Sequence, residues 1–502
     1  MIRRLLIANR GEIAVRIARA CRELGVESVA AYSEADARAL HVAVADRAVL
    51  IGPAPAAESY LSIPKLIDAA RSSGADAVHP GYGFLSENAA FADACERAGL
   101  AFVGPPSHVI AQMGSKVGAR QLMEGAGIPV VPGDTPRDQS DEGVRASIER
   151  LGLPVLVKPS AGGGGKGMRL IRERGEIAEM VQAARREAVS AFGDGTLYVE
   201  RLIDRPRHVE VQIVGDRHGH VVHVFERECS VQRRHQKVIE ESPSPAITPG
   251  LRHRLTAAAV RAARTVSYRG AGTVEFLVDL SSADPDRAPF YFLEMNTRLQ
   301  VEHPVTEEVA GIDLVRAQLA VAAGEPLPWA QDSLVQRGHT IEARVYAEDP
   351  SRGFLPQAGD LLLYREPRLP GLRVDSGVVE GDQVSIHYDP LLAKVIASGE
   401  TRDHAMARLT AALRAYPILG IQTNIAFLLR ILEHRQFRSG LADTGFLDRE
   451  GAALAGAPDV ELPAPVAAAI AAHGELTARG GADRDPAPRA WDPWRQSNGQ
   501  RL

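Results

Sequence analysis

The sequence predicts an α/β protein with a doubly wound parallel sheet in its N-terminal part. Short apolar runs, beginning with 5–8 and 26–32, alternate with longer segments in which apolar residues recur at helical spacing. This strand–helix alternation is typical of parallel strands with helices on both faces of the sheet. The length of 502 residues is enough for about three domains.

The first predicted domain covers residues 1–113. Its opening strand at 5–8 is followed by a helix over 11–24, which Gly25 ends. The later strands and helices of this domain are expected, in chain order, at 26–32, 48–51, 64–72, 77–79, 88–98 and 101–104.

A second domain at 114–334 and a third at 335–450 are expected to follow. The second has a predicted helix from 115, strands at 208–213, 221–226, 273–280 and 290–295, and a helix at 251–266. The third has predicted strands at 340–345, 361–364 and 394–397, and helices at 404–415 and 424–432. Residues 451–502 are rich in Ala, Pro and Gly, which is typical of a linker or the start of a following domain.

Composition and charge narrow the classes of function. A formal net charge of -5 and the lack of a basic tail argue against a nucleic-acid partner. Cys21, Cys95 and Cys229 are far apart, which excludes a disulfide framework and a cysteine zinc site and favours a reducing cytoplasm. The first apolar run is too short for a signal peptide, and no run of about 18 apolar residues predicts a membrane span.

The most specific local signal is the segment 155–168, VLVKPSAGGGGKGM. An apolar strand delivers Lys158, and five glycines then fill the six positions 162–167, interrupted only by Lys166. Glycines leave backbone N–H groups free to converge on an anion, so the run predicts a polyphosphate site. Its spacing fits neither the Walker pattern nor the dinucleotide fingerprint. The alternative is a flexible linker.

Three oxygen-bearing side chains predict a cation site. Glu294 and Asn296 are two apart on one predicted strand and therefore point to one face, while Glu275 lies on the preceding strand. Two carboxylates and an amide oxygen suit Mg²⁺, and the same ligands would accept Mn²⁺. Magnesium keeps positions for phosphate oxygens, so we expect a nucleotide to complete the site. The alternative is a pair of exposed acids on a sheet.

The strand is expected to continue through 297–304, TRLQVEHP. Arg298, Gln300 and Glu302 alternate and would share the metal-bearing face of an extended chain. The guanidinium would hold a carboxylate-like or bicarbonate-like anion, and Glu302 would take a proton from it. The alternative is a surface ladder of salt bridges.

Two further cationic segments are candidates for nucleotide contacts. The run 229–238, CSVQRRHQKV, concentrates cationic and polar donors, and Lys116 follows a Gly-Ser pair at a predicted helix start. The run lacks interleaved aromatic residues, so nucleotide phosphates and ribose are a better partner for it than nucleic acid. The alternative for Lys116 is a solvated surface lysine.

Together these segments resemble the biotin carboxylase family, the ATP-grasp component of acetyl-CoA, propionyl-CoA and pyruvate carboxylases. The resemblance covers roughly residues 1–450. Its motifs, in chain order, are 7–14 (IANRGEIA), 79–88 (HPGYGFLSEN), the glycine run, 232–237, 294–306, and 342–344 with 388–390.

The resemblance implies an N-terminal parallel-sheet (pre-ATP-grasp) domain, an ATP-grasp domain with a mobile lid at about 131–203, and a C-terminal α+β domain. It also implies that ATP phosphorylates bicarbonate, that the carboxyphosphate breaks down to CO₂ and phosphate, and that N1′ of biotin is carboxylated. Closure of the lid would keep water from the carboxyphosphate.

The resemblance assigns roles to residues by position. Residues expected to bind ATP are Lys116, Lys158, Gly163, Gly164, Gly165, Lys166, Glu200, Arg201, Ile203, His208, Gln232, His235 and Leu277. Residues expected to bind bicarbonate are Lys237, Arg298, Gln300, Val301 and Glu302. Glu302 is the expected base, Arg344 is expected to stabilise the biotin enolate, and Lys237 and Arg298 are also expected to be catalytic. Tyr82 and Arg344 are expected to contact biotin.

The chain departs from the family pattern at two of these positions. Arg201 stands where many members carry lysine, which puts its contact with adenine in doubt. Lys166 stands where some carry arginine, and a point charge there still suits a phosphate.

The implied partners follow from a missing motif. No Ala-Met-Lys-Met biotin-attachment sequence occurs, so biotin is expected as a substrate on a carrier protein or domain. A carboxyltransferase subunit and a homodimer are also implied, without nucleic acid or membrane. The segment 491–499 resembles the region after the carboxylase domain in acyl-CoA carboxylase α subunits. We therefore expect an acetyl- or propionyl-CoA carboxylase α subunit of fatty acid biosynthesis that ends before its carrier domain.

Three alternatives stay open at this point. Another ATP-grasp ligase, such as a carboxylate–amine ligase, would share Glu275, Glu294 and Asn296 but should lack the run 298–304. A non-catalytic ATP-binding regulatory subunit should have lost Glu302 or a metal ligand. The third alternative is the biotin carboxylase part of a pyruvate carboxylase. The acyl-CoA is chosen by the carboxyltransferase partner.

Overall fold

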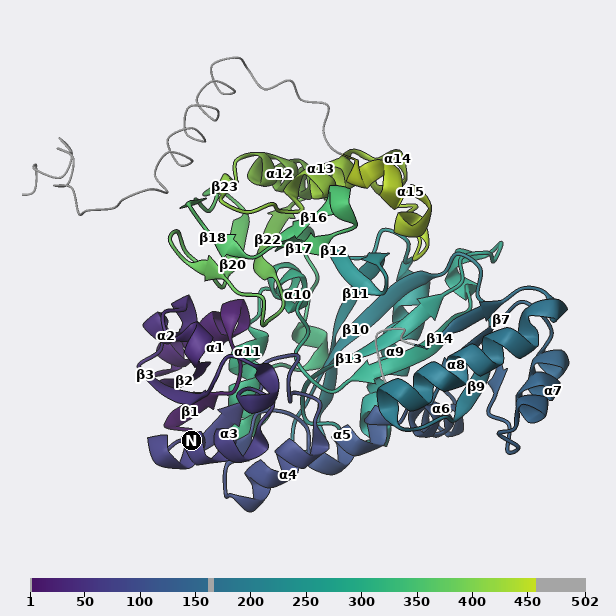
Figure 1. Ribbon diagram of the computed structural model, residues 1–502, viewed down its shortest axis with the longest axis horizontal. Coiled ribbons are helices and arrows are strands. Elements are labelled where there is room, and N and C mark those ends of the chain that lie inside the picture. The colour runs from purple at the N-terminus through teal and green to yellow at the C-terminus, as the bar shows by residue number, and fades with distance from the viewer. Residues whose placement is uncertain (1, 161–166, 457–502) are drawn as a thin grey trace, which may run out of the picture. The chain divides into compact units, whose positions relative to one another are not determined.

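A computed structural model describes residues 2–160 and 167–456, and residues 1–456 form one compact unit (Figure 1). The predicted ATP ligands Gly163, Gly164, Gly165 and Lys166 lie outside the described residues, as does the tail at 457–502. None of the helices within the described ranges combines the length and the apolar character needed to cross a bilayer.

The first sheet is parallel throughout, with the strand order β3-β2-β1-β4-β5. Alternate residues of β1 enter two cores: Leu5 and Ile7 pack with α1, whereas Leu6 packs with α3 and α4 on the opposite face. This confirms the doubly wound prediction. The elements are β1 (Arg4–Ile7), α1 (Gly11–Leu24), β2 (Glu27–Ser33), α2 (Leu40–Val44), β3 (Arg47–Gly52), α3 (Ile63–Ser73), β4 (Ala77–His79), α4 (Ala89–Arg97) and β5 (Ala101–Phe102).

The largest sheet has eight antiparallel strands in the order β14-β13-β10-β11-β12-β15-β22-β20. It is continuous from β12 to β15, so the predicted second and third domains share it, and the boundary at 334 stays a prediction. Its strands are β10 (Arg207–Gly215), β11 (Val221–Arg233), β12 (Gln236–Ser242), β13 (Gly270–Val278), β14 (Phe290–Asn296), β15 (His339–Tyr346), β20 (Leu372–Ser376) and β22 (Leu391–Gly399).

Helices cover this sheet at both ends. Helix α9 (Pro249–Thr265) packs on β10 and β11 through its buried apolar side. Helix α12 (Arg402–Arg414) packs on β22 and β15 (Figure 1). The other helices are α5 (Ser107–Gly114), α6 (Lys116–Gly125), α10 (His303–Ala310), α11 (Leu314–Ala323), α13 (Ile425–Glu433), α14 (Arg435–Arg438) and α15 (Phe446–Ala455).

A four-stranded sheet of order β6-β9-β7-β8 occupies the predicted lid region. Val144 and Ile148 of α7, with Val181 of α8, pack against it in a core separate from that of the large sheet. Figure 1 shows both helices beside β7 and β9. The elements are β6 (Gly133–Asp134), α7 (Asp141–Leu151), β7 (Val155–Pro159), β8 (Arg169–Ile171), α8 (Ile177–Phe192) and β9 (Leu197–Arg201).

One predicted element is wrong. Strand β14 ends at Asn296, and α10 begins at His303. Residues 297–302 form an irregular connection that ends in a turn at 301–302 and is called the turn 297–302 below, so the predicted strand does not continue through Arg298 and Glu302. Pro304 lies in the first turn of α10, where its fixed φ favours a helix start over a strand. The predicted strand at 361–364 is also reduced, to β19 (Leu363–Tyr364).

Candidate active site

The register of the large sheet places three acids side by side. Glu294 pairs with Glu275 across β14 and β13, and Glu275 pairs with Glu210 across β13 and β10. Like charges at directly opposite positions repel each other. A fold that buries Glu210 and Glu275 therefore needs cations at the same place.

Lys237 supplies one of those cations. Its Nζ lies 2.9 Å from Glu275 Oε1 and 2.6 Å from Glu302 Oε1, and it also pairs with Glu210. Burial acts to lower the pKa of Lys237, but the three carboxylates outweigh it and raise that pKa well above its usual value. Lys237 and Glu302, both predicted to be catalytic, are thus in direct contact.

Arg344 holds the other oxygen of Glu302. Its Nη2 lies 2.9 Å from Glu302 Oε2, and its Nε donates to Glu240 Oε1 at 2.6 Å. Burial would raise the pKa of Glu302, but Lys237, Arg344 and Arg227 lower it well below the usual range. Glu302 is therefore a buried carboxylate that stays ionised, as a base must.

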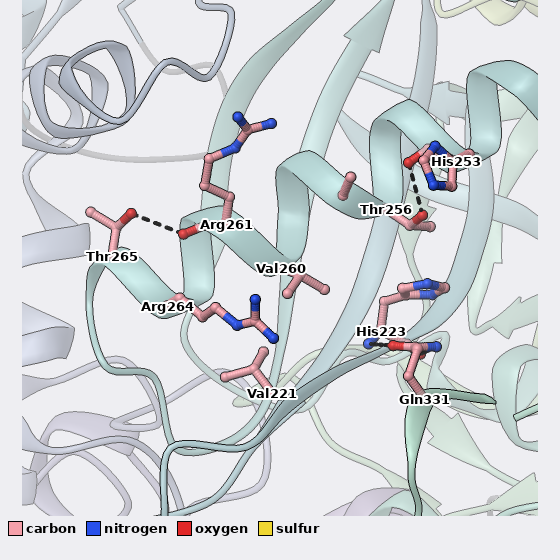
Figure 2. Close-up of a pocket in the computed structure, with 10 residues that line it drawn as sticks. Val221, His223, His253, Thr256, Val260, Arg261, Arg264, Thr265 and Gln331 are labelled. Atoms are coloured by element: carbon pink, nitrogen blue, oxygen red, sulfur yellow. Dashed lines mark hydrogen bonds between the residues drawn. The ribbon is translucent and has the colours of Figure 1, made fainter. Parts of the chain in front are cut away.

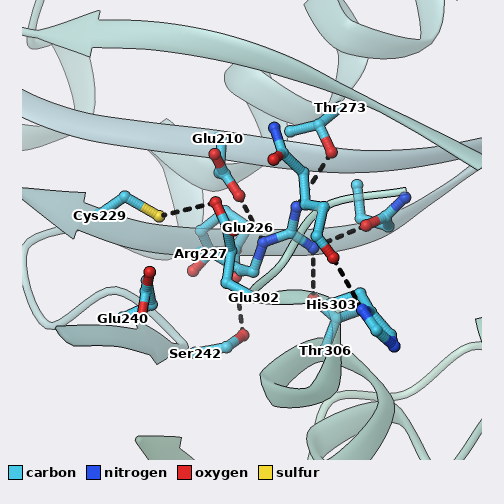
Figure 3. Close-up of polar contacts among 12 residues, drawn as sticks. Glu210, Glu226, Arg227, Cys229, Glu240, Ser242, Thr273, Glu302, His303 and Thr306 are labelled. Carbon is cyan, nitrogen blue, oxygen red and sulfur yellow. Dashed lines mark hydrogen bonds and ion pairs between the residues drawn. The ribbon is translucent and has the colours of Figure 1, made fainter. Parts of the chain in front are cut away.

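Arg227 is a cation that sequence reasoning missed. Its fully buried guanidinium donates to Glu210 Oε1 at 2.6 Å, and to Thr273 and Thr306 at 3.0 Å each (Figure 3). It also donates to Gln212 Oε1 at 2.7 Å. The available signal was indirect: polar residues alternate with apolar residues along the strand 208–213. Two of these polar residues, Glu210 and Gln212, are buried and accept from Arg227.

The predicted metal ligands lie together. Asn296 Nδ2 donates to Glu275 Oε1 at 2.8 Å, and the side chain of Glu294 makes no hydrogen bond or ion pair with another described residue. Burial and the nearby Glu275 raise the pKa of Glu294. Two facing carboxylates and an amide form an all-oxygen donor set that a divalent cation would relieve of repulsion, so the residues fit Mg²⁺ or Mn²⁺. The second carboxylate oxygen of Glu275, Oε2, lies 2.9 Å from His208 Nε2, so this acid also has a partner within the protein.

The turn at 297–302 brings Arg298 and Gln300 to the same place although it is not a strand. Arg298 donates to Gln300 Oε1 at 2.7 Å and to Asn296 Oδ1 at 3.2 Å. Its Nε donates at 2.9 Å to Glu87, which sequence reasoning did not single out although it belongs to the 79–88 motif. The guanidinium is thus fixed beside the acids, as recognition of a planar anion requires.

The predicted ATP contacts that are described lie at the edge of this cluster. Lys158 of β7 forms an ion pair with Glu200 of β9, which also accepts from Arg120 at 3.0 Å. Lys116 begins α6, and its charge acts on Glu294 and His235. Gln232 and His235 belong to the β11–β12 hairpin, Ile203 and Leu277 are half-buried, and Arg201 is exposed. The binding roles of all these residues stay predictions.

A hollow in the surface lies away from these residues. It has a volume of about 680 Å³ and lies between α9 and the start of β11 (Figure 2). None of the predicted site residues lines it; its lining residues are Val221, His223, His253, Thr256, Ala257, Val260, Arg261, Arg264, Thr265 and Gln331. The chemistry of the charged cluster, rather than the size of a hollow, therefore locates the candidate site.

Family models match three consecutive parts of the chain. Residues 1–110 match the biotin carboxylase N-terminal domain, 115–330 the ATP-binding domain of the carbamoyl-phosphate synthase L chain, and 342–449 the biotin carboxylase C-terminal domain. The biotin carboxylase of Halalkalibacterium halodurans is 51% identical over 447 residues, which cover 89% of this chain and 97% of that protein. The chain belongs to the biotin carboxylase family.

Two further similar proteins are a subunit and a domain of larger carboxylases. The mitochondrial methylcrotonoyl-CoA carboxylase subunit alpha of Rattus norvegicus is 52% identical over 447 residues, covering 89% of this chain and 62% of that subunit. The chain therefore spans less than two thirds of that relative's length. A crystal structure of the biotin carboxylase domain dimer of Hydrogenobacter thermophilus 2-oxoglutarate carboxylase, with MgADP, ADP and bicarbonate, has a TM-score of 0.86 and 42% identity. The match covers 90% of this chain and 99% of that one. The predicted family and three-part architecture are confirmed.

Proposed function

We propose that this chain carboxylates biotin held on a carrier, using ATP and bicarbonate, as the first half-reaction of an acyl-CoA carboxylase. The observation that carries the proposal is Glu302. This buried carboxylate is kept ionised between Lys237 and Arg344, next to an anion-binding arginine. A carboxylate–amine ligase has no need of this base, so family membership and Glu302 favour the same reaction.

The proposed first step uses Glu302 as a base. Bicarbonate between Arg298 and Lys237 would give its proton to Glu302, and the freed oxygen would attack the γ-phosphorus of ATP. A new P–O bond forms, and the bond between γ-phosphorus and ADP breaks. Glu275, Glu294 and Asn296 would hold a divalent cation, which supplies neutralisation of phosphate charge. A base in this position contributes about 10² to 10⁴ in rate.

The proposed second step uses Arg344. Carboxyphosphate breaks down to CO₂ and phosphate, and the released phosphate would take the proton from N1′ of biotin. Negative charge then develops on the ureido oxygen of biotin, where Arg344 is the buried cation that would stabilise it until N1′ bonds to the carbon of CO₂. Tyr82, which is half-buried, would form one wall of the biotin pocket.

The partners and the location are also proposals. A carrier domain and a carboxyltransferase subunit are expected as partners, and the dimeric state described for the Hydrogenobacter thermophilus domain supports a homodimer. Cys21, Cys95 and Cys229 are buried and free, which supports a reducing cytoplasm. Acetyl-CoA or propionyl-CoA, within fatty acid biosynthesis, is the expected acceptor. The rat methylcrotonoyl-CoA carboxylase relative makes methylcrotonoyl-CoA a second candidate.

The test is ADP release from Mg-ATP and bicarbonate, with and without free biotin. The wild type should be stimulated by biotin only when bicarbonate is present. Glu308→Gln removes an exposed acid on α10 and serves as the matched control for Glu302→Gln, which should lose the stimulation. Stimulation by an amine or another carboxylate in place of biotin would refute the proposal.

A further inference from the structure

A second buried cation contacts the turn that carries Glu302. Lys394, in the middle of β22, is 0% exposed, and its Nζ donates to the carbonyl oxygen of Val301 at 2.9 Å. The register places Lys394 directly opposite Arg344 on β15. Two neighbouring cations thus reach the same turn: Arg344 binds the Glu302 carboxylate, and Lys394 binds the carbonyl of the residue before it.

The charge of Lys394 is supported by acids from other segments. Its Nζ lies 3.1 Å from Glu12 Oε1 on α1 and 3.8 Å from Asp375 Oδ2 on β20. Burial acts to lower the pKa of Lys394, but the nearby acids, Glu12 before the others, outweigh it and raise that pKa. Glu12 belongs to the 7–14 motif, for which the active-site cluster itself gives no role. Its carboxylate is a counter-ion of Lys394, which gives this one residue of the motif a role.

The turn needs such support because no strand holds it. Residues 297–302 lie outside the ladder of the sheet, so their main-chain groups depend on other donors. The ring of His303, the first residue of α10, lies 2.7 Å from the carbonyl oxygen of Gln300. Lys394 is the donor that ties the Val301 carbonyl to the body of the sheet. The Tyr82 ring lies 5.8 Å from the same ammonium.

We propose that Lys394 is a positioning residue that fixes the turn 297–302, so that Glu302 and the Val301 main chain face bicarbonate. This inference rests on the proposed function. Lys394 itself would not touch the substrate. Its effect would come from the placement of Glu302, because a displacement of about 1 Å in a reacting group can cost about 10² in rate.

The test compares Lys394→Met with Lys394→Arg and with a matched control. Arg402 is a half-buried cation that pairs with Glu241 and donates to two main-chain carbonyls, those of Phe437 and Arg438, at 2.9 Å each; none of these partners is a predicted site residue. We expect Lys394→Met to lower kcat/KM for bicarbonate by about 10²-fold, with KM for ATP unchanged within about twofold. Lys394→Arg, which keeps the charge and a donor, should recover about tenfold of that loss.

Arg402→Met should lower the melting temperature without changing either kinetic constant by more than about twofold. The positioning role is wrong if Lys394→Met changes neither kcat/KM for bicarbonate nor KM for ATP. It is also wrong if that variant raises KM for bicarbonate and KM for ATP alike. If Lys394→Met does not fold, Glu12→Gln decides. It should lower kcat/KM for bicarbonate by about threefold to tenfold, and no change would overturn the proposal. A wild type without biotin-stimulated ADP release would instead refute the proposed function itself.

Discussion

Two buried pairs of acids in the large sheet differ in their state of ionisation. Glu302 and Glu275 share Lys237, and their pKa values are lowered although both are buried. Glu240 and Glu342 lie directly opposite each other on β12 and β15, both 0% exposed. Burial raises the pKa of Glu240 to about 7 and that of Glu342 well above its usual value.

The difference between the pairs lies in their contacts. Both oxygens of Glu302 contact cations, whereas neither oxygen of Glu342 has a hydrogen-bond donor among the described residues. Burial alone therefore does not determine ionisation: Glu302 contacts two cations, Glu240 contacts Arg344 alone, and Glu342 contacts none among the described residues. The first pair is prepared to accept a proton, and the second retains one.

The largest expected effect is on the ionised pair. Glu302→Gln removes the base but keeps the size of the side chain, so kcat for biotin-dependent ADP release should fall by about 10² to 10⁴. Glu342→Gln, which only fixes the neutral form already present, should keep kcat within about threefold. Equal losses in the two variants would erase the functional difference between the pairs.

The next effect concerns the cation that contacts both regions. Arg344→Met removes a partner of Glu302 and Glu240 together, so kcat should fall by about 10² to 10³ while KM for ATP changes little. Arg344→Lys keeps the charge but not the planar fork, and it should recover only part of kcat. A rise in KM for ATP with unchanged kcat would show that Arg344 acts in nucleotide binding instead.

A smaller effect is expected for the third acid of the row. Glu294→Gln removes one carboxylate of the proposed cation site, so the Mg²⁺ concentration giving half-maximal ADP release should rise by at least about tenfold. Glu308→Gln is the exposed control. An unchanged Mg²⁺ requirement in Glu294→Gln would remove Glu294 from the metal ligands.

The smallest effect is on stability. The unfolded chain releases the Glu342 proton near its ordinary pKa of 4.5, whereas the folded protein keeps it to higher pH. The stability from this proton is full below about pH 4.5 and is lost as pH rises toward the folded pKa. Unfolding measured from about pH 5.5 to about pH 8.5 should therefore show the wild type losing stability relative to Glu342→Gln, by up to about 1.4 kcal/mol per pH unit. Parallel pH profiles would mean that Glu342 is ionised in the folded protein.

The contrast between local and distant contacts explains how much the sequence could predict. The strands and helices of the first sheet follow from periodicity within short segments, and Glu294 and Asn296 were predicted to share a face from spacing alone. The polar alternation of Arg298, Gln300 and Glu302 suggested a strand, although Pro304 indicated the start of a helix.

The buried partners could not be predicted in the same way. Glu240 and Lys394 find their counter-ions on segments far along the chain, and Arg227 finds Glu210 across the pairing of β10 with β11. No pattern within one segment encodes such pairs. Lys394 was nevertheless visible as a single charge within an apolar strand. A charge in such a position must be paired when the strand is buried.

The most direct test of the central claim is transfer of label from radioactive bicarbonate to free biotin, with Mg-ATP. The account predicts that the wild type labels biotin with one ADP released per label, and that Glu302→Gln transfers at least about 10²-fold less. ATP hydrolysis without labelled biotin, or equal labelling by Glu302→Gln, would contradict the assignment of this cluster as the site of biotin carboxylation.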